Sequence, residues 1–305
     1  MNVSVIIPTL DAQGRLAALL ESLGRQSLRP AETIVIDSSS ADATADIARR
    51  AGCRAEVIPR ASFDHGRARN LGARMAAGDT LVFMTQDAMP ADEHFLAALV
   101  DPVRRGDAAA TYARQVAPPG SPPTEVFARR FYYPQHSERR TIADLPAMGL
   151  RTFFLSNVAS AVARGAFEAV GGFPEHIIMN EDMLLAAALV RRGYAVAYAA
   201  DAVVLHAHRY TLVQVLRRYF DIGASRTEEG DLLAGATWRG QGTQFLGGLV
   251  RFLVREGAWA WLPRAAAESA MKLAGFHLGR RHRWMPRALK RRLSMNAAFW
   301  ATAGR

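Results

Sequence analysis

The chain has 305 residues, of which 50% are hydrophobic and 22% charged; this is enough apolar material for a globular core and excludes a disordered chain. A single cysteine, Cys53, excludes an internal disulfide and favours a reducing compartment. We find no signal-peptide pattern and no run of the roughly 18 apolar residues that span a bilayer, so we expect a soluble or peripheral, cytoplasmic protein.

The net charge of +10 is unevenly distributed along the chain. The part from His206 onward holds 17 of the 38 basic residues and 6 of the 28 acidic ones, a net of +11, which leaves −1 for the first 205 residues. This asymmetry predicts two parts with different tasks, and we place them at residues 1–208 and 209–305.

Strands and helices alternate in the first part. Apolar runs predict strands at residues 3–7, 33–36, 55–58 and 80–84, and helical spacing predicts helices at 15–22, 41–51 and 67–76. A further helix is predicted at 181–192, followed by two strands at 194–198 and 203–205. This alternation predicts an α/β fold with a doubly wound, mostly parallel sheet, which binds ligands beyond the carboxyl ends of its strands.

Two stretches depart from the alternation. Residues 128–150 are polar and basic, and we predict an irregular segment that forms a flexible flap over the site. From Tyr210 to the end the pattern is helical, with glycine-rich breaks near residues 235–248, so we expect a helical, basic C-terminal extension.

Three carboxylates, Asp11, Asp37 and Asp87, lie just after predicted strands, at the ligand-binding edge of such a sheet. Asp37 is suited to bind a ribose or a base, and equally to start an Asx-turn. Asp87 is suited to hold a divalent cation whose shell a diphosphate completes; the alternative is a turn carboxylate that accepts from nearby N–H groups.

Three other segments carry candidate chemistry. In FDHGRARN, residues 63–70, a helix N-terminus with two arginines favours phosphate binding, although Asp64 is also an ordinary N-cap. In Asn180-Glu181-Asp182 one acid is suited to general-base work, but acids in a first helical turn also suit the helix dipole. His206 and His208 point the same way in an extended chain and either bind a metal with Asp87 or form a surface pair.

Taken in order, these segments resemble the family 2 glycosyltransferases, which have the GT-A fold. VIIPT at residues 5–9 and AVGGF at 169–173 add to the resemblance, which covers residues 3–208. FDHGRARN and MTQD, residues 84–87, are most similar to rhamnosyltransferases of bacterial surface polysaccharides. HRYT at 208–211, RRYFDIG at 217–223 and RLSM at 292–295 resemble the C-terminal part of those enzymes.

The resemblance implies an inverting, metal-dependent transfer of a sugar, rhamnose from dTDP-rhamnose, to a hydroxyl of a lipid-linked or polysaccharide acceptor. It makes Asp182 the base, with Glu181 in support, and assigns Mg²⁺ or Mn²⁺ to Asp87 with His206 or His208. It assigns nucleotide contacts to the following residues: Pro8, Thr9, Asp11, Asp37, His65, Arg69, Asn70 and Gln86.

The chain departs from the family pattern at three positions. The usual Asp-x-Asp is Thr85-Gln86-Asp87, the usual Asn after the first strand is Asp11, and the second acid after Asp37 is Ser38. We therefore expect either a low metal affinity in the absence of nucleotide or a histidine as the second metal ligand. The alternatives are a UDP-sugar donor, a sugar nucleotidyltransferase, which would need an arginine-containing glycine-rich loop that residues 9–14 lack, and a non-catalytic nucleotide-binding protein.

Eight basic residues lie between Lys272 and Arg292, and no acid follows Glu268. Apolar side chains are interleaved with them: Phe276, Leu278, Trp284, Met285, Leu289 and Leu293. A basic segment with aromatic anchors suits an anionic membrane surface, at about 1 kcal/mol per basic residue. No nucleic-acid-binding module is recognisable, so we expect peripheral attachment at the inner face of the membrane and no nucleic-acid partner.

Overall fold

The computed structural model describes residues 2–227, 230–236 and 241–302. This part contains one nine-stranded sheet in the order β3-β2-β1-β4-β8-β6-β9-β5, with β7 beside β9. The strands are β1 Val3–Thr9, β2 Glu32–Asp37, β3 Arg54–Val57, β4 Thr80–Met84, β5 Met89–Pro90, β6 Ala110–Val116, β7 Glu138–Arg140, β8 Ala159–Ala163 and β9 Val196–Leu205. Strands β1 to β4 pair in parallel, as do β6 and β9, while β8 runs antiparallel between β4 and β6.

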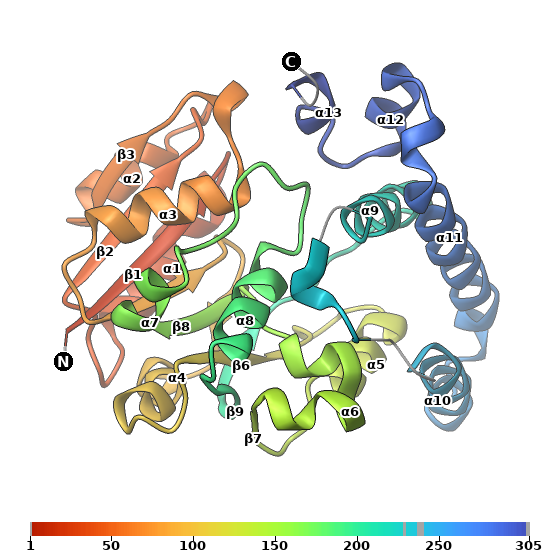
Figure 1. Ribbon diagram of the computed structural model, residues 1–305, viewed down its shortest axis with the longest axis horizontal. Coiled ribbons are helices and arrows are strands. Elements are labelled where there is room, and N and C mark those ends of the chain that lie inside the picture. The colour runs from red at the N-terminus through yellow and green to blue at the C-terminus, as the bar shows by residue number, and fades with distance from the viewer. Residues whose placement is uncertain (1, 228–229, 237–240, 303–305) are drawn as a thin grey trace.

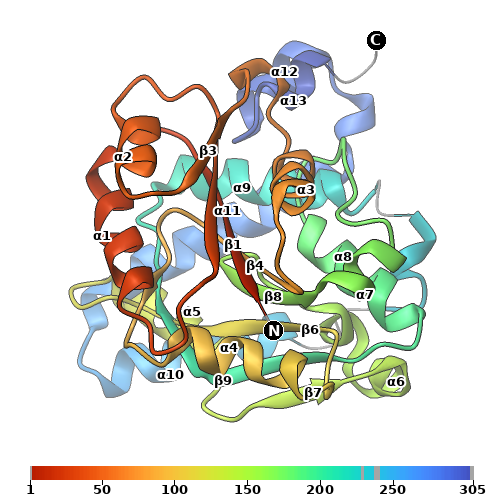
Figure 2. The same cartoon turned by 90° about the vertical axis from the view of Figure 1, so that its left-hand side faces the viewer.

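Helices cover both faces of this sheet, which confirms the predicted α/β fold. They are α1 Gln13–Gly24, α2 Thr44–Arg50, α3 His65–Met75, α4 Phe95–Arg104, α5 Pro123–Tyr132, α6 Leu145–Met148, α7 Arg164–Ala169, α8 Glu181–Arg191, α9 Leu212–Ser225, α10 Gln241–Arg255, α11 Leu262–Arg280, α12 Arg287–Leu293 and α13 Phe299–Thr302. Figure 2 shows α1 and α2 on one side of strands β1 to β3 and α3 on the other.

The alternation of side chains along β1 builds two cores. Val5 and Ile7 pack with the apolar face of α1, whereas Ile6 packs on the opposite face with Ala68 and Ala73 of α3. Because successive strand residues point to opposite faces, a strand apolar at every position is buried on both. This double burial places the carboxyl ends of β1 and β4, with the loops that follow them, at one edge of the sheet.

Two predictions for the middle of the chain are wrong. The two predicted strands at 194–198 and 203–205 form one strand, β9, whose pairing with β6 shifts register between Ala113 and Arg114. The predicted irregular flap at residues 128–150 is ordered, and contains the end of α5, β7 and α6. The charges that suggested a solvated flap are partly buried, since Arg140 is fully buried and donates to Tyr112 Oη at 2.9 Å and to the carbonyl of Phe154 at 2.8 Å.

The C-terminal helices form a separate layer, on the right in Figure 1, in which α9 and α11 cross closely and α10 packs on α5. The helical character predicted after Tyr210 is confirmed for the described residues. Within the predicted glycine-rich break, residues 237–240 lie outside the described part of the chain. None of the described helices has both the length and the apolar character to cross a bilayer.

Candidate active site

A cavity of about 2140 Å³ lies between the carboxyl edge of the sheet and the C-terminal helices. It is larger than the roughly 300–1,000 Å³ typical of a pocket for one small molecule, so it has room for two substrates. Ten of the predicted site residues line it: Pro8, Thr9, His65, Arg69, Gln86, Asp87, Glu181, Asp182, His206 and His208. The other three, Asp11, Asp37 and Asn70, do not.

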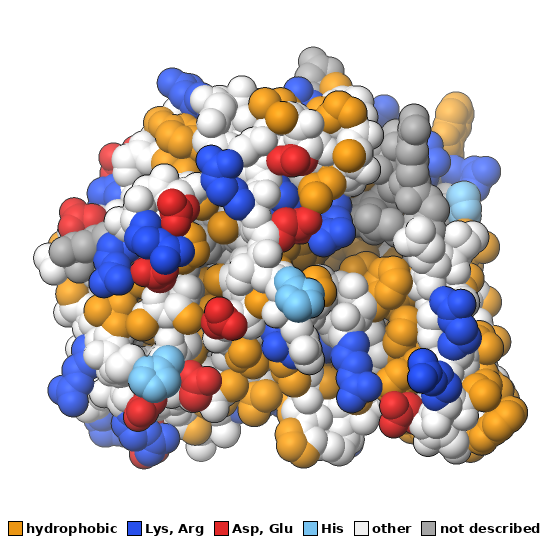
Figure 3. Space-filling view, turned by 90° about the horizontal axis from the view of Figure 1, so that it is seen from below, with side chains coloured by type: hydrophobic (Ala, Val, Ile, Leu, Met, Phe, Trp, Pro, Cys, Tyr) orange, Lys and Arg blue, Asp and Glu red, His pale blue; other side chains and the backbone are white. Residues whose placement is uncertain are grey.

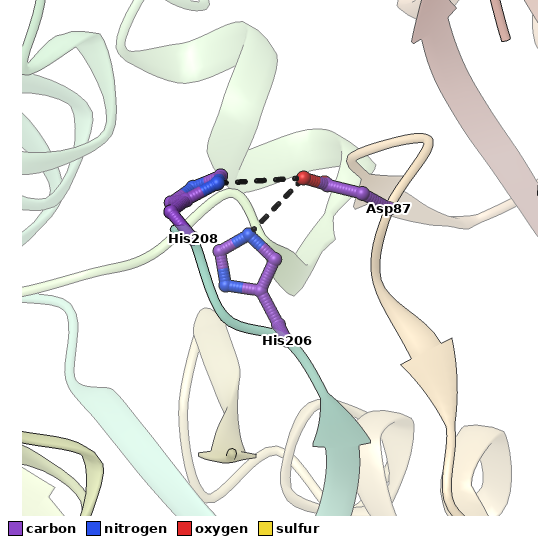
Figure 4. A group of neighbouring side chains, drawn as sticks. All are labelled: Asp87, His206 and His208. Carbon is purple, nitrogen blue, oxygen red and sulfur yellow. Dashed lines mark ion pairs between the residues drawn. The ribbon is translucent and has the colours of Figure 1, made fainter. Parts of the chain in front are cut away.

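At the centre of the cavity Asp87, His206 and His208 point toward one another (Figure 4). Oδ2 of Asp87 lies 3.5 Å from Nε2 of His206 and 3.8 Å from Nδ1 of His208. Asp87 follows β4, and the histidines follow β9, where their spacing of two puts both rings on one side of the extended chain. The sequence therefore predicted correctly that these three side chains meet.

A second layer of polar groups orients His206. Nδ1 of His206 lies 3.0 Å from Oε1 of Gln115, and the amide nitrogen of Gln115 donates to Tyr133 Oη at 2.6 Å and to Ser156 Oγ at 2.9 Å. Because both amide hydrogens are used in this way, Oε1 can only accept, and His206 carries its proton on Nδ1. When His206 is neutral, Nε2 presents a lone pair on the side of Asp87, as a metal ligand must; when His206 is charged, Nε2 carries a proton and donates to Asp87.

The local electrostatics keep two of these groups in their ligand forms. Burial by itself would raise the pKa of Asp87, but hydrogen bonding and charge from His206 outweigh it, and the pKa falls below its ordinary value. Burial, aided by His206, lowers the pKa of His208 to about 3. At neutral pH the carboxylate is thus ionised and His208 is neutral, so one oxygen and two nitrogens fit a divalent cation.

A second pair of acids opens α8. The carboxylate of Glu181 pairs with Arg69 at 3.0 Å, and the two side chains are only 9% and 4% exposed. Asp182 accepts from the backbone N–H of Asn157 at 3.2 Å and from that of Met183 at 2.8 Å. The side-chain amide of Asn157 also donates to Glu181 at 3.3 Å, so Asn157 links the two acids.

The surroundings of the two acids shift their pKa values in opposite directions. Burial would raise the pKa of Glu181, but the positive charge of Arg69 lowers it below its ordinary value. Burial, together with the negative charge of Glu181, raises the pKa of Asp182 to about 7. A carboxyl that titrates near neutral pH can take a proton from a substrate hydroxyl, whereas Glu181 is held as a permanent carboxylate.

The other end of the cavity is formed by the loops after β1 and β2. Gln86 ties the loop after β4 to the loop after β1, since its amide nitrogen donates to the carbonyl of Leu10 at 3.0 Å and its oxygen accepts from the N–H of Leu10 at 2.7 Å. Asp37 is buried and accepts from Thr9 Oγ1 at 3.1 Å. Ser38 lines the cavity beside it, and its hydroxyl oxygen has no hydrogen-bond partner among the described residues.

Two predicted nucleotide contacts, Asp11 and Asn70, lie outside the cavity and hold loops. Asp11 accepts from the N–H of Ala41 at 2.9 Å. The side chain of Asn70 donates to the carbonyl of Phe173 at 2.9 Å and accepts from its N–H at 2.9 Å, which ties α3 to the AVGGF loop. An asparagine that ties two segments together and an asparagine that contacts a ligand look the same in a sequence. The motif alone therefore could not tell these two roles apart.

Sequence reasoning missed three cavity residues, Gln115, Asn157 and Arg218. A signal existed for Gln115, because it is a polar residue at the end of the buried strand β6. For Asn157 and Arg218 no local pattern distinguishes a cavity residue from a solvated one, since only the packing of distant elements brings them to the site.

The C-terminal wall of the cavity is rich in aromatic side chains. They are Tyr132, Tyr210, Tyr219, Phe245, Trp261 and Phe276. Nζ of Lys272 lies 5.1 Å from the ring centre of Phe245 and 5.7 Å from that of Tyr219. This wall is therefore apolar, with the ammonium group of Lys272 held over two aromatic rings, whereas the edge formed by the sheet is polar.

Comparisons with known proteins agree with this geometry. Residues 4–171 match the profile of glycosyl transferase family 2. The chain is 36% identical to the O-antigen chain rhamnosyltransferase RfbN of Salmonella typhimurium, with 98% of this chain and 96% of that protein covered. It is 34% identical to the O-antigen chain rhamnosyltransferase WbaN of Salmonella anatum, with the same coverage.

Solved structures share the fold. The mannosyltransferase PcManGT of Pyrobaculum calidifontis, in complex with GDP-Man and Mn²⁺, matches with a TM-score of 0.59 and 20% identity over 97% of this chain and 85% of that one. TarS of S. aureus with UDP-GlcNAc matches with a TM-score of 0.55 and 16% identity over 93% and 92%. With its profile match and its two full-length relatives, the chain belongs to glycosyl transferase family 2.

Proposed function

We propose that this glycosyltransferase moves rhamnose from dTDP-rhamnose, with inversion, to a hydroxyl of a lipid-linked glycan. The donor sugar and the glycan acceptor are supported by the two relatives named as O-antigen chain rhamnosyltransferases, which align along almost the whole chain. The observation that carries the chemistry is that Asp182 and the cluster of Asp87, His206 and His208 line one cavity.

Asp182 is the general base. Its carboxylate takes the proton of the acceptor hydroxyl, and the acceptor oxygen attacks the anomeric carbon on the side opposite the diphosphate. The bond from that carbon to the diphosphate oxygen breaks, and its electron pair leaves with the diphosphate. Glu181, held by Arg69, keeps a negative charge beside Asp182, which raises the basicity of Asp182.

Asp87, His206 and His208 would hold the divalent cation, which would neutralise the leaving diphosphate when bound. A set of one carboxylate and two imidazoles suits Mn²⁺ better than Mg²⁺, because Mg²⁺ prefers a shell of oxygens alone. We therefore expect activity with Mn²⁺ to exceed that with Mg²⁺.

The nucleoside would lie against Pro8, Thr9, Ser38 and Gln86 at the sheet edge. Asp37 would act through Thr9, whose hydroxyl donates to it, and Asp11 and Asn70 would hold the loops. His65 and Arg69 line the neighbouring part of the cavity, at the N-terminus of α3.

The acceptor would occupy the aromatic wall formed by the C-terminal helices. Apolar surface close to the ammonium group of Lys272 suits a glycan carried on a lipid, because the lipid chain can bury apolar groups while the ammonium faces an anionic head. Attachment to the cytoplasmic face of the membrane would bring this wall to its substrate.

The outer surface of these helices supports membrane contact. On α10 the residues Leu246, Val250 and Val254 are exposed at a spacing of four, which puts them on one stripe of the helix. Trp284 is 90% exposed among the basic residues that follow Lys272. Figure 3 shows hydrophobic side chains along the right-hand rim of the molecule, with Lys and Arg between them.

Four of the apolar residues expected to face the membrane do not do so. Leu278, Met285 and Leu293 pack instead around Phe220 and Trp300, and Phe276 lines the cavity. The membrane-facing surface that we propose is therefore the α10 stripe with Trp284 and the basic residues of α12, rather than the C-terminal segment alone.

The proposed function is tested by the transfer of labelled rhamnose from dTDP-rhamnose to lipid-linked glycans in the presence of Mn²⁺, in parallel with UDP-sugar donors. We expect transfer from the dTDP donor, and a loss of about 10²- to 10⁴-fold in Asp182→Asn with nearly unchanged binding of dTDP. Equal rates for wild type and Asp182→Asn would contradict the assignment of the base, and transfer from UDP-sugars alone would overturn the donor.

A further inference from the structure

Two arginines of the C-terminal helices, Arg218 and Arg264, line the cavity, and Arg264 is paired with Glu268 at 2.7 Å. Arg218 on α9 is half-buried and lines the cavity. Among the described residues, no carboxylate lies within ion-pair distance of its guanidinium, whereas the buried Arg69 is paired with Glu181. The charge of Arg218 acts on Asp221, one turn later in α9, but the two side chains form no ion pair, so the guanidinium has no counter-charge in contact with it in the described part of the chain.

The position of Arg218 is given by its neighbours. Its guanidinium lies 5.8 Å from the ring centre of Tyr210, and that ring stacks on His208 with centres 4.8 Å apart. His208 belongs to the proposed metal cluster. Arg218 is also close enough to His65 for its charge to add, after the larger effect of burial, to the lowering of the pKa of that imidazole.

Arg218 thus lies near the metal cluster and also near the N-terminus of α3. The cluster itself contains one carboxylate, Asp87. A divalent cation and one carboxylate leave a net charge of +1, and Arg218 adds a second positive charge. A nucleoside diphosphate carries more negative charge than the cluster alone would balance, and a guanidinium suits its oxygens in a bidentate geometry.

We propose that Arg218 binds the diphosphate of the donor and stabilises the charge that develops there as the sugar leaves. This inference rests on the proposed function, and it makes the C-terminal helical layer a part of the donor site. Under this inference α9 contributes to the donor site as well as to the aromatic wall proposed for the acceptor.

The side chain of Arg218 is not needed to hold α9 in place. The helix begins with a capping box between Thr211 and Gln214, and its packing face is formed by Phe220, Gly223 and Ala224. A change of Arg218 should therefore leave the fold intact. Arg217 is the matched control, because it is the next arginine on the same helix and does not line the cavity.

The test is calorimetric titration of dTDP and of thymidine, each with Mn²⁺, into wild type, Arg218→Gln, Arg218→Lys and Arg217→Gln. We expect Arg218→Gln to weaken dTDP binding about 10- to 100-fold and thymidine binding not at all, since only a diphosphate meets the lost cation. Arg218→Lys should recover part of the loss, and Arg217→Gln should bind dTDP like wild type.

Equal dTDP affinity in Arg218→Gln and wild type would overturn the inference and leave the proposed function standing. A parallel loss for dTDP and thymidine would also overturn it, because that result indicates a structural role. Failure of wild type to bind any nucleoside diphosphate would instead count against the proposed function.

Discussion

Glu181 and Asp182 are neighbours in the chain, yet their surroundings push their pKa values apart. Arg69 holds Glu181 as a carboxylate, and burial beside that charge raises the pKa of Asp182 to about 7. A general base works best when its pKa lies near the working pH. The buried ion pair attaches α8 to α3, and under the proposed function it would also serve the chemistry of Asp182.

The pH dependence of transfer follows from this arrangement. Below about 7 Asp182 is mostly protonated and cannot accept a proton, so the turnover rate at saturating substrates should rise about tenfold per pH unit and level off above that value. Asp87 and His208 have pKa values lowered below this window. Initial rates across the range check the profile, and a flat rate profile would contradict the prediction.

At the scale of residues, the sequence predicted best that Asp87, His206 and His208 meet, because all three follow strand ends and the two histidines alternate along one extended segment. It could not predict which polar residues face the ligand. Asp37 and Asn70 look like ligand contacts in the motif, but their hydrogen bonds are used within the protein. The supporting roles of Gln115 and Asn157 depend on β6 and the loop before β8, which are distant in the chain from the groups they hold.

The crossing of α9 and α11 depends on glycines that allow the two backbones to touch. A methyl group at Gly279 would lie 2.0 Å from the carbonyl oxygen of Phe220, and one at Gly275 would lie 2.3 Å from that of Leu216. Both neighbours are backbone atoms and cannot turn aside. The side chains of α9 that line the cavity are positioned by this contact.

Gly279→Ala should therefore force the helices apart and lower the free energy of unfolding by about 1–3 kcal/mol, as overpacking typically does. Gly247→Ala on α10 is the control, because nothing lies within 4 Å of the added methyl group and alanine favours a helix. Urea denaturation followed by circular dichroism compares them. If Gly279→Ala were as stable as Gly247→Ala, the backbones of α9 and α11 would not be in close contact at Gly279, and the prediction would be wrong.

At the scale of elements, hydrophobic periodicity predicted β1, β2, β4 and α8 well because each is buried on a face that imposes its period. It failed for residues 128–150, where the charge of Arg140 suggested solvent although its side chain is buried among carbonyls and Tyr112. The single strand β9 was divided in two because its alanines and Asp201 interrupt the apolar run at the register shift.

The charge of the whole molecule is concentrated on one side. The basic C-terminal helices lie opposite the end that carries α2 (Figure 1), and their exposed surface combines arginines with Trp284. Such a distribution would turn the aromatic wall of the cavity toward an anionic membrane and leave the sheet edge open to a water-soluble donor.

Membrane attachment can be tested by sedimentation with vesicles that contain anionic lipids. The triple variant Trp284→Ser/Arg291→Gln/Arg292→Gln should bind at least tenfold more weakly, because each basic residue near the surface contributes about 1 kcal/mol. The control Arg49→Gln/Arg50→Gln on α2 should bind like wild type, and binding by wild type should weaken in high salt. Unchanged binding of the triple variant would contradict the proposed surface.

At this largest scale the sequence predicted a basic helical extension, but not that it forms one wall of the cavity. Residues from Pro8 to Ala298 line that space. The packing of α9 and α11 over the sheet edge follows from close backbone contacts, and no local sequence pattern reports which surface two helices will cover.

The central claim is that Asp87, His206 and His208 hold the cation of a donor diphosphate in the cavity that Asp182 lines. Anomalous diffraction at the manganese edge, from crystals grown with Mn²⁺ and dTDP, tests it most directly. We predict one strong peak at about 2 to 2.5 Å from the carboxylate and imidazole ligand atoms and from diphosphate oxygens. A nucleotide-associated peak bound by other residues, or dTDP seated outside this cavity, would contradict the account.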